Sequence, residues 1–180
     1  MGGSVKMYKK EYTERKVYSN KSHLLNLKTG YWYELDDMPE AMEMKGILVG
    51  NLIYTVGGHR LTSLKNISTY NLSTGEWDAV AELPEIMERP GLAYHEGILY
   101  IFEQNRIYTY NLDTKVMKKY FIGIDLMFAE MFYHDGMLYI LGGQQGGEPS
   151  QGFTIERAMA SAPDLYRVSL DEFRKTMAYD

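Results

Sequence analysis

The sequence predicts an all-β protein in which a four-stranded antiparallel unit repeats along the chain, and two interleaved motifs support this prediction. The first motif begins Asn-Leu-x-Thr, and its copies start at Asn26, Asn71 and Asn111, with spacings of 45 and 40 residues. The second is an apolar run around a tyrosine, and its copies contain Tyr54, Tyr100 and Tyr139, 46 and 39 residues apart. A fixed period of this length is typical of stacked repeat architectures.

The apolar motif predicts a tight β-hairpin. In each copy a first apolar run is joined to the tyrosine run by a glycine-containing dipeptide, namely Gly50-Asn51, Glu96-Gly97 and Asp135-Gly136. Glycine supplies the positive φ that such turns require. Because the runs are almost continuously apolar, we expect both faces of these strands to be buried.

The Asn-Leu-x-Thr motif predicts a second hairpin. Residues 67–72 alternate in character, Ser73-Thr74-Gly75 form the turn, and the return strand starts near Trp77. Alternation is typical of a strand nearer solvent. Residues 107–112 repeat this pattern, and residues 165–170 repeat it more weakly. Two hairpins in about 45 residues make one four-stranded unit, which is the size of a propeller blade.

Within this pattern the chain resembles the kelch repeat. The likeness rests on the double glycines Gly57-Gly58 and Gly142-Gly143, on Tyr70, Thr74-Gly75, Trp77 and Pro84, and on Thr29-Gly30 and Trp32. The middle unit departs from the pattern, with Glu103-Gln104 in place of the double glycine. The resemblance implies kelch-type β-propeller blades. It also implies that large aromatic side chains fill the space between blades as scaffold, and these are Trp32, Trp77, Tyr54, Tyr100 and Tyr139.

The count of half-units indicates an incomplete ring in one chain. We expect half a blade over residues 1–40, followed by blades over 41–85, 86–124 and 125–180. Gly2-Gly3 stand where the missing second strand of the half-blade would end, and residues 171–180 fit either a short helix or a last strand. Propellers close with four to eight blades. Open ends expose apolar blade faces, so we expect either a longer propeller or a homo-oligomer that closes the open ends.

Composition excludes several classes of protein. A formal charge of −5 argues against a large nucleic-acid-binding surface. With no cysteine, disulfides, thiolate metal sites and cysteine nucleophiles are excluded. No apolar run reaches the roughly 18 residues of a membrane span. The first residues have no apolar signal core, so a native N-terminus would indicate a cytoplasmic protein.

Strand parity sorts the loops of each unit to two ends. The tight turns lie at one end; the loops between strands 2 and 3, and the links from strand 4 to the next strand 1, lie at the other. The loops between strands 2 and 3 are Ser4–Tyr18, His59–Asn66, Glu103–Arg106 and Gln144–Pro163. Variable loops are where recognition residues concentrate. We therefore expect partner-binding residues here, drawn from His59, Arg60, Lys65, Arg89, Gln104, Asn105, Arg106, Gln144, Gln145 and Glu148.

These features predict a non-catalytic protein-interaction scaffold with a protein partner and no catalytic residue, metal or cofactor. The spacing of His23, His59, His95 and His134 largely follows the repeat, and residues 142–147 lack the Lys-Ser/Thr of a phosphate loop. Asp36-Asp37 are expected to cap a turn. The alternative, which the family resemblance also allows, is a carbohydrate-modifying enzyme of the sialic-acid epimerase type. Such an enzyme needs a closed central pocket, which further blades or a second chain would have to complete.

Overall fold

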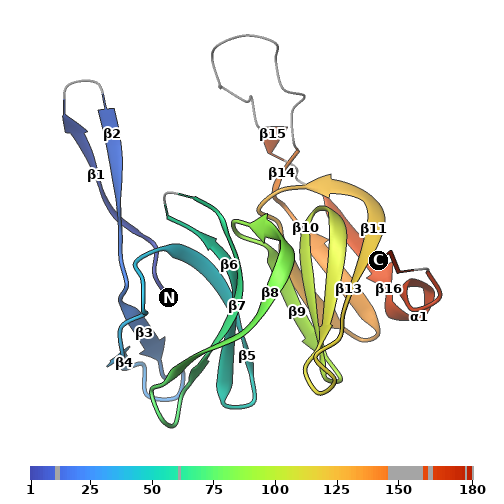
Figure 1. The fold of residues 1–180 in the computed structure, drawn as a ribbon, viewed down its shortest axis with the longest axis horizontal. Coiled ribbons are helices and arrows are strands. Elements are labelled where there is room, and N and C mark those ends of the chain that lie inside the picture. The colour runs from blue at the N-terminus through green and yellow to red at the C-terminus, as the bar shows by residue number, and fades with distance from the viewer. Residues whose placement is uncertain (11–12, 61, 146–159, 162–163, 177, 180) are drawn as a thin grey trace. The chain divides into compact units, whose positions relative to one another are not determined.

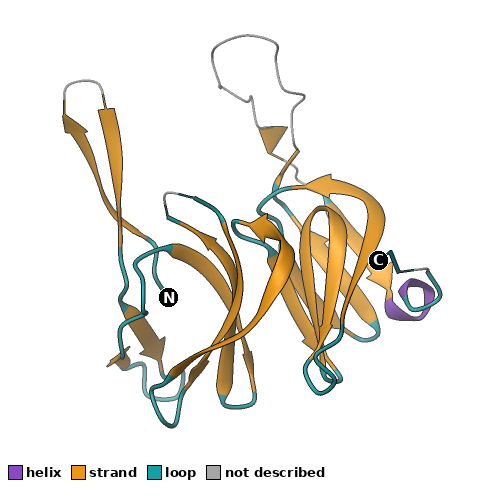
Figure 2. Ribbon diagram, viewed as in Figure 1, coloured by secondary structure: helices purple, strands orange, loops and turns teal. Residues whose placement is uncertain are grey.

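The computed structural model describes residues 1–10, 13–60, 62–145, 160–161, 164–176 and 178–179. It is built almost entirely of antiparallel strands (Figure 2), which confirms the predicted all-β class. The chain divides into two compact units, Met1–Arg89 and Pro90–Asp180, and each is described by itself.

The centre of the first unit is a four-stranded antiparallel sheet in simple sequential order (Figure 1). Its strands are β5 (Glu43–Val49), β6 (Leu52–His59), β7 (Leu64–Asn71) and β8 (Trp77–Met87). Two hairpins precede it, one of β1 (Ser4–Lys10) with β2 (Thr13–Tyr18) and one of β3 (Ser22–Leu25) with β4 (Trp32–Leu35). The segment Ser4–Tyr18, expected as a loop, is thus largely a hairpin.

The Asn-Leu-x-Thr motif forms the turn between β7 and β8, because its asparagine bonds to its own backbone. The Asn71 side-chain oxygen accepts hydrogen bonds from the N–H groups of Ser73 (2.9 Å) and Thr74 (3.4 Å). The Gly75 N–H donates to the Asn71 carbonyl (2.8 Å), with Gly75 at φ +75°. Asn26 and Asn111 make the same bonds in their copies. This local chemistry explains why the motif recurs.

The second unit contains two larger sheets. The first is formed by β9 (Gly91–His95), β10 (Ile98–Asn111) and β11 (Met117–Leu126), and the other by β12 (Glu130–His134), β13 (Met137–Leu141) and β16 (Leu165–Ser169). A short pair, β14 (Gln144–Gln145) with β15 (Ala160–Ser161), extends from the latter.

Strand β10 contributes two strand segments to its sheet: its first half pairs with β9 and its second half with β11. It folds back on itself near Gln104, which takes the left-handed φ of +58° (Figure 1). The Leu112 N–H donates to the Gly97 carbonyl (2.8 Å), so the two ends of β10 meet. The same bond joins Leu72 to Asn51 beside β6 and β7. The middle unit therefore has four strand segments, as expected, although it lacks the double glycine.

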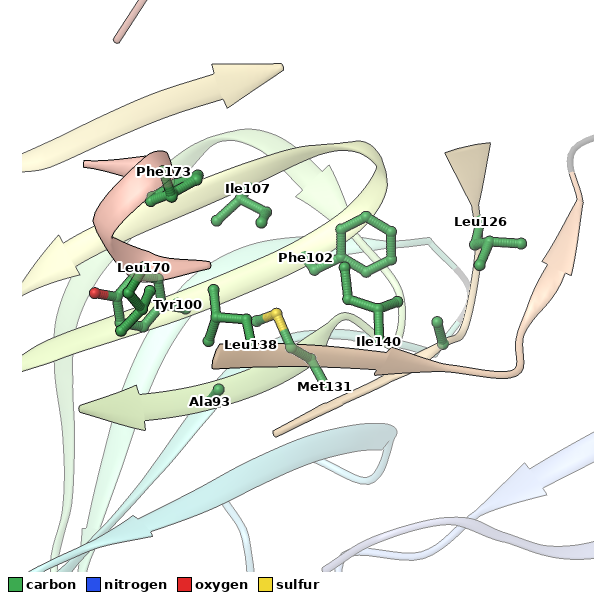
Figure 3. Packing of buried hydrophobic residues seen from close by; sticks show 11 residues of the cluster. Ala93, Tyr100, Phe102, Ile107, Leu126, Met131, Leu138, Ile140, Leu170 and Phe173 are labelled. Carbon is green, nitrogen blue, oxygen red and sulfur yellow. The ribbon is translucent and has the colours of Figure 1, made fainter. Parts of the chain in front are cut away.

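The core of the second unit lies between its two larger sheets (Figure 3). Gly91 permits this close approach, since a Cβ built there would lie 2.9 Å from Cβ of Met131 on β12. The buried cluster comprises Ala93, Tyr100, Phe102, Ile107, Leu126, Ala129, Met131, Leu138, Ile140, Leu170 and Phe173.

The last sheet has three strands in the described part of the chain, and a short helix follows it. Helix α1 (Leu170–Phe173) starts at Ser169, whose hydroxyl accepts a hydrogen bond from the Glu172 N–H. Leu170 and Phe173 are both buried. Beyond the helix, the Tyr179 N–H donates to the Lys119 carbonyl of β11 (2.8 Å). Of the two forms expected for the end of the chain, the helix is the one observed.

Two expectations about burial are wrong in part. Strand β6 and the first half of β10 are buried on both faces, but β5, β12 and β13 alternate between covered and exposed residues. Trp77 packs on Tyr70, with ring centroids 5.1 Å apart, whereas Trp32 is exposed. Trp32 lies on a two-stranded hairpin whose outer side nothing covers among the described residues.

Candidate interaction surface at the loop end of the sheets

The tight turns gather at one end of each sheet, where several of their polar side chains bond to the turns themselves. In the first unit the Asn51 side-chain amide donates to the Ser73 hydroxyl (2.6 Å), which joins the β5–β6 and β7–β8 turns. In the second unit the Tyr94 and Tyr133 hydroxyls accept hydrogen bonds from Gly97 and Gly136 of their own turns (3.2 and 3.0 Å). Each side chain here closes a turn.

The opposite end of the β5–β8 sheet carries the expected basic residues of the first unit. Nδ1 of His59 lies 3.6 Å from Oε1 of Glu88, and the Ser63 hydroxyl donates to that same oxygen (2.9 Å). Arg60 pairs with Glu40 (3.5 Å). The loop after β6 therefore meets both the link before β5 and the link after β8.

Each link between one sheet or hairpin and the next carries a methionine, and a glycine of a double glycine packs against its backbone. A Cβ built on Gly57 would lie 2.3 Å from the Met87 carbonyl oxygen, and one built on Gly2 would lie 2.2 Å from that of Met42. A Cβ on Gly143 would lie 2.7 Å from that of Met127. The pair Gly2-Gly3 thus takes the place expected for a double glycine.

In the second unit the link from β11 to β12 contacts two of the predicted loops, the one around Gln104 and the one that starts at Gln144. Gln104 pairs with Leu126, and Gln144 exchanges two backbone hydrogen bonds of 2.9 Å with Met127. The guanidinium of Arg106 donates to the side-chain oxygen of Gln104. The loop residues of both sheets are therefore held on the Leu126–Met127 segment.

Within each unit the structure brings several of the predicted residues together. His59 and Arg60 lie together in the first unit, as do Gln104, Asn105, Arg106, Gln144 and Gln145 in the second. Arg89 ends the first unit, directly after Glu88. Lys65 lies in β7 and pairs with Glu82 of β8 (2.6 Å). Glu148 lies outside the described residues.

Sequence reasoning missed Ser63 and Glu40, which hold the basic residues of the first loop in place. It assigned Met42 to strand or loop packing and passed over Met87 and Met127, although their spacing gave a signal. Met42, Met87 and Met127 stand one, four and three residues before β5, β9 and β12, so one methionine recurs in each link. Aligning the repeats on the apolar motif would have shown that the links recur as closely as the turns do.

Other candidate sites have structural explanations. His95 stacks on Tyr133, with ring centroids 3.8 Å apart, in the second unit. Asp36 accepts a hydrogen bond from the Tyr70 hydroxyl (3.3 Å), while Asp37 pairs with Lys21 (3.0 Å). Hydrogen bonds from Lys21 to Glu34 and Asp37 raise the pKa of its ammonium group. No group of three or more His, Cys, Asp or Glu side chains suited to a metal occurs among the described residues.

Comparison with known proteins identifies one repeat directly. The family model described as the kelch motif matches residues 47–84, from the middle of β5 into β8. This match confirms the resemblance inferred from the glycines, Tyr70 and Trp77. No curated protein matches the chain. No helix in the described part of the chain is long and apolar enough to cross a membrane.

Proposed function

We propose, from the premise that this is a kelch-repeat chain, that it serves as a non-catalytic protein-interaction scaffold. Kelch repeats generally mediate contacts between proteins. The partner would bind at the loop end of the blades, through His59, Arg60, Arg89, Gln104, Asn105, Arg106, Gln144, Gln145 and Glu148.

One observation supports the proposal: exposed polar residues at the loop end stand on hydrogen-bonded backbone. Asn105 and Gln145 are exposed, yet the backbone beside each is tied to the Leu126–Met127 link. Arg60 is likewise exposed beside the paired end of β6. Side chains held on ordered backbone lose less conformational entropy on binding than side chains of a free loop.

The proposal includes three further expectations. Residues 1–180 act as one propeller segment, with a half-blade over 1–40 and blades over 41–85, 86–124 and 125–180. The chain is cytoplasmic, which imaging of the tagged protein tests. It associates with itself through its open blade ends.

Affinity capture from the source cells tests the scaffold function with matched variants. Arg60→Glu and Arg106→Glu change the loop end of each unit, and Lys28→Glu makes the same charge reversal at a tight turn. We expect a defined set of proteins to be lost with the two arginine variants and retained with Lys28→Glu. Equal capture by all three variants, with folding verified by circular dichroism, would contradict the proposal.

The carbohydrate-modifying alternative has a separate test. Titration calorimetry with N-acetylneuraminic acid and with simple hexoses measures direct sugar binding. The scaffold proposal expects no heat of binding. Saturable heat with any of these sugars would favour the enzyme.

A further inference from the structure

The three strands of the last sheet repeat the first three strand segments of the β9–β11 sheet. The turn from β9 to β10 pairs His95 with Ile98, and the turn from β12 to β13 pairs His134 with Met137. Aligning these turns makes Tyr139 the equivalent of Tyr100. The further equivalents on the same face are Ala93 with Phe132, Phe102 with Leu141, and Ile107 with Leu165.

Burial differs sharply between the equivalent faces. In the first sheet this face packs against the next sheet, and Phe102 and Ile107 are 1% and 0% exposed. In the last sheet the same positions hold Leu141 and Leu165, which are 45% and 57% exposed. Phe132 is 44% exposed. The last sheet therefore presents, uncovered, the kind of face that its predecessor buries.

The name last-sheet face is used here for Glu130, Phe132, Tyr139, Leu141, Leu165 and Arg167, and the same side of the sheet continues toward the β12–β13 turn with His134, Met137 and Ser169. The rings of Phe132 and Tyr139 stack nearly parallel, with centroids 5.2 Å apart, and form a flat apolar surface. Glu130 lies on β12, at one edge of the sheet, and Arg167 lies on β16, at the other. Apolar residues thus lie between one negative and one positive charge.

We propose that the last-sheet face binds the same face of a second copy of this chain about a two-fold axis. An axis running along β13 would place β12 of one copy over β16 of the other. Arg167 would then meet the ring of the partner's Phe132, with the carboxylate of the partner's Glu130 close by, and each contact would occur twice. One acid and one base on opposite edges make the face complementary to itself.

Among the described residues, the β5–β8 sheet has a face of the kind that could receive the last-sheet face, and this face is partly covered. In the second unit Met131, Leu138 and Ile140 of the later sheet pack on the earlier one. The equivalent side of the β5–β8 sheet includes Tyr70, which is 2% exposed and bonded to Asp36, just after β4. A three-stranded sheet cannot seat there without displacing that segment. The same face of a second copy meets no such obstacle.

The size of the face sets the strength of the contact. Three strands of five residues span roughly 16 by 10 Å between strand axes. The area of the face is therefore well below the roughly 800 Å² that each partner buries in a standard stable interface. We therefore expect a reversible dimer, whose population rises with protein concentration.

Sedimentation velocity of the full chain across a wide concentration range tests the proposal. The variant Leu165→Lys alters the last-sheet face, while Leu48→Lys alters an equally exposed leucine of β5 (57% and 58% exposed). We expect a monomer–dimer equilibrium whose dissociation constant rises at least tenfold with Leu165→Lys and stays unchanged with Leu48→Lys. Urea unfolding of each variant verifies that it folds.

Charge reversal provides a second readout that does not depend on apolar loss. Glu130→Arg and Arg167→Glu should each weaken the dimer, and the double variant should restore it. A monomer at every concentration overturns the proposal, as does equal weakening by Leu48→Lys. Association into species larger than a dimer as the protein concentration rises overturns the two-fold arrangement. Arg106→Glu leaves dimerisation unchanged, so failure here is distinguishable from failure of the loop-surface proposal.

Discussion

Gly57 lies against the backbone of Met87, so closely that a Cβ built on it would stand 2.3 Å from the Met87 carbonyl oxygen. This contact joins the end of β6 to the end of β8 within one sheet. Gly57 also has φ +62°, which side chains with a Cβ disfavour. Glycine is therefore a packing requirement at position 57, where the end of β6 meets the link after β8.

The variant Gly57→Ala tests this requirement. Since the new methyl group meets backbone, which cannot rotate away, we expect a loss of unfolding free energy of about 3 kcal/mol in urea denaturation. Gly50→Ala is the matched control, because Gly50 has φ +59° but nothing within 4 Å of a built Cβ. That control should cost about 1 kcal/mol through φ alone. Equal losses in both variants would show that the close approach is not limiting.

Lys115 occupies the left-handed turn position that glycine fills in the other copies, at φ +61°. Because a Cβ is unfavourable there, Lys115→Gly should raise the unfolding free energy by about 0.5–1 kcal/mol, even though glycine is more flexible in the unfolded chain. Lys115→Ala keeps the strain and removes only the hydrogen bond from Nζ to the Leu112 carbonyl. It should give no such gain in the urea midpoint.

Asn111 tests the side-chain bonds that define the turn motif. Its side-chain oxygen accepts from the N–H groups of Asp113 (3.0 Å) and Thr114 (2.8 Å). Removing this acceptor with Asn111→Ala should cost about 1 kcal/mol in thermal or urea unfolding. Asn111→Asp keeps the acceptor and should cost much less. If both variants unfold alike, the asparagine is not holding the turn.

Alkaline pH should destabilise the second unit through its buried tyrosines. Burial raises the pKa of Tyr100, although hydrogen bonding to Arg174 opposes the shift, and burial also raises the pKa of Tyr110. A folded-state pKa above the unfolded value of about 10 means that stability is fully present below pH 10 and falls as the pH rises further. Urea midpoints from pH 8 to 11 measure this fall. Tyr100→Phe and Tyr110→Phe should each make it shallower, and an unchanged slope would contradict the prediction.

The strands and turns followed from the sequence because their causes are local. Asn71 bonds to backbone N–H groups two and three residues away, and Gly75 adopts a positive φ that glycine accepts without strain. The kelch resemblance rested on these features, and the match over residues 47–84 confirms it. Strand parity also brought the loops of each sheet to one end, whereas the pairings of Ser63 and Glu40 with them depend on side-chain rotamers that no spacing reveals.

By itself, then, the sequence determined the repeat, the strand order within each unit and the chemistry of the turns, since these depend on residues close together in the chain. Only the tertiary structure decided what each face meets. Tyr100 and Tyr139 occupy equivalent positions in equivalent motifs, yet only Tyr100 is fully buried, because another sheet lies on its face. The exposure of Trp32 and the burial of Leu170 and Phe173 in the short helix were likewise decided by the tertiary structure. Burial depends on neighbouring elements that a local sequence pattern does not encode.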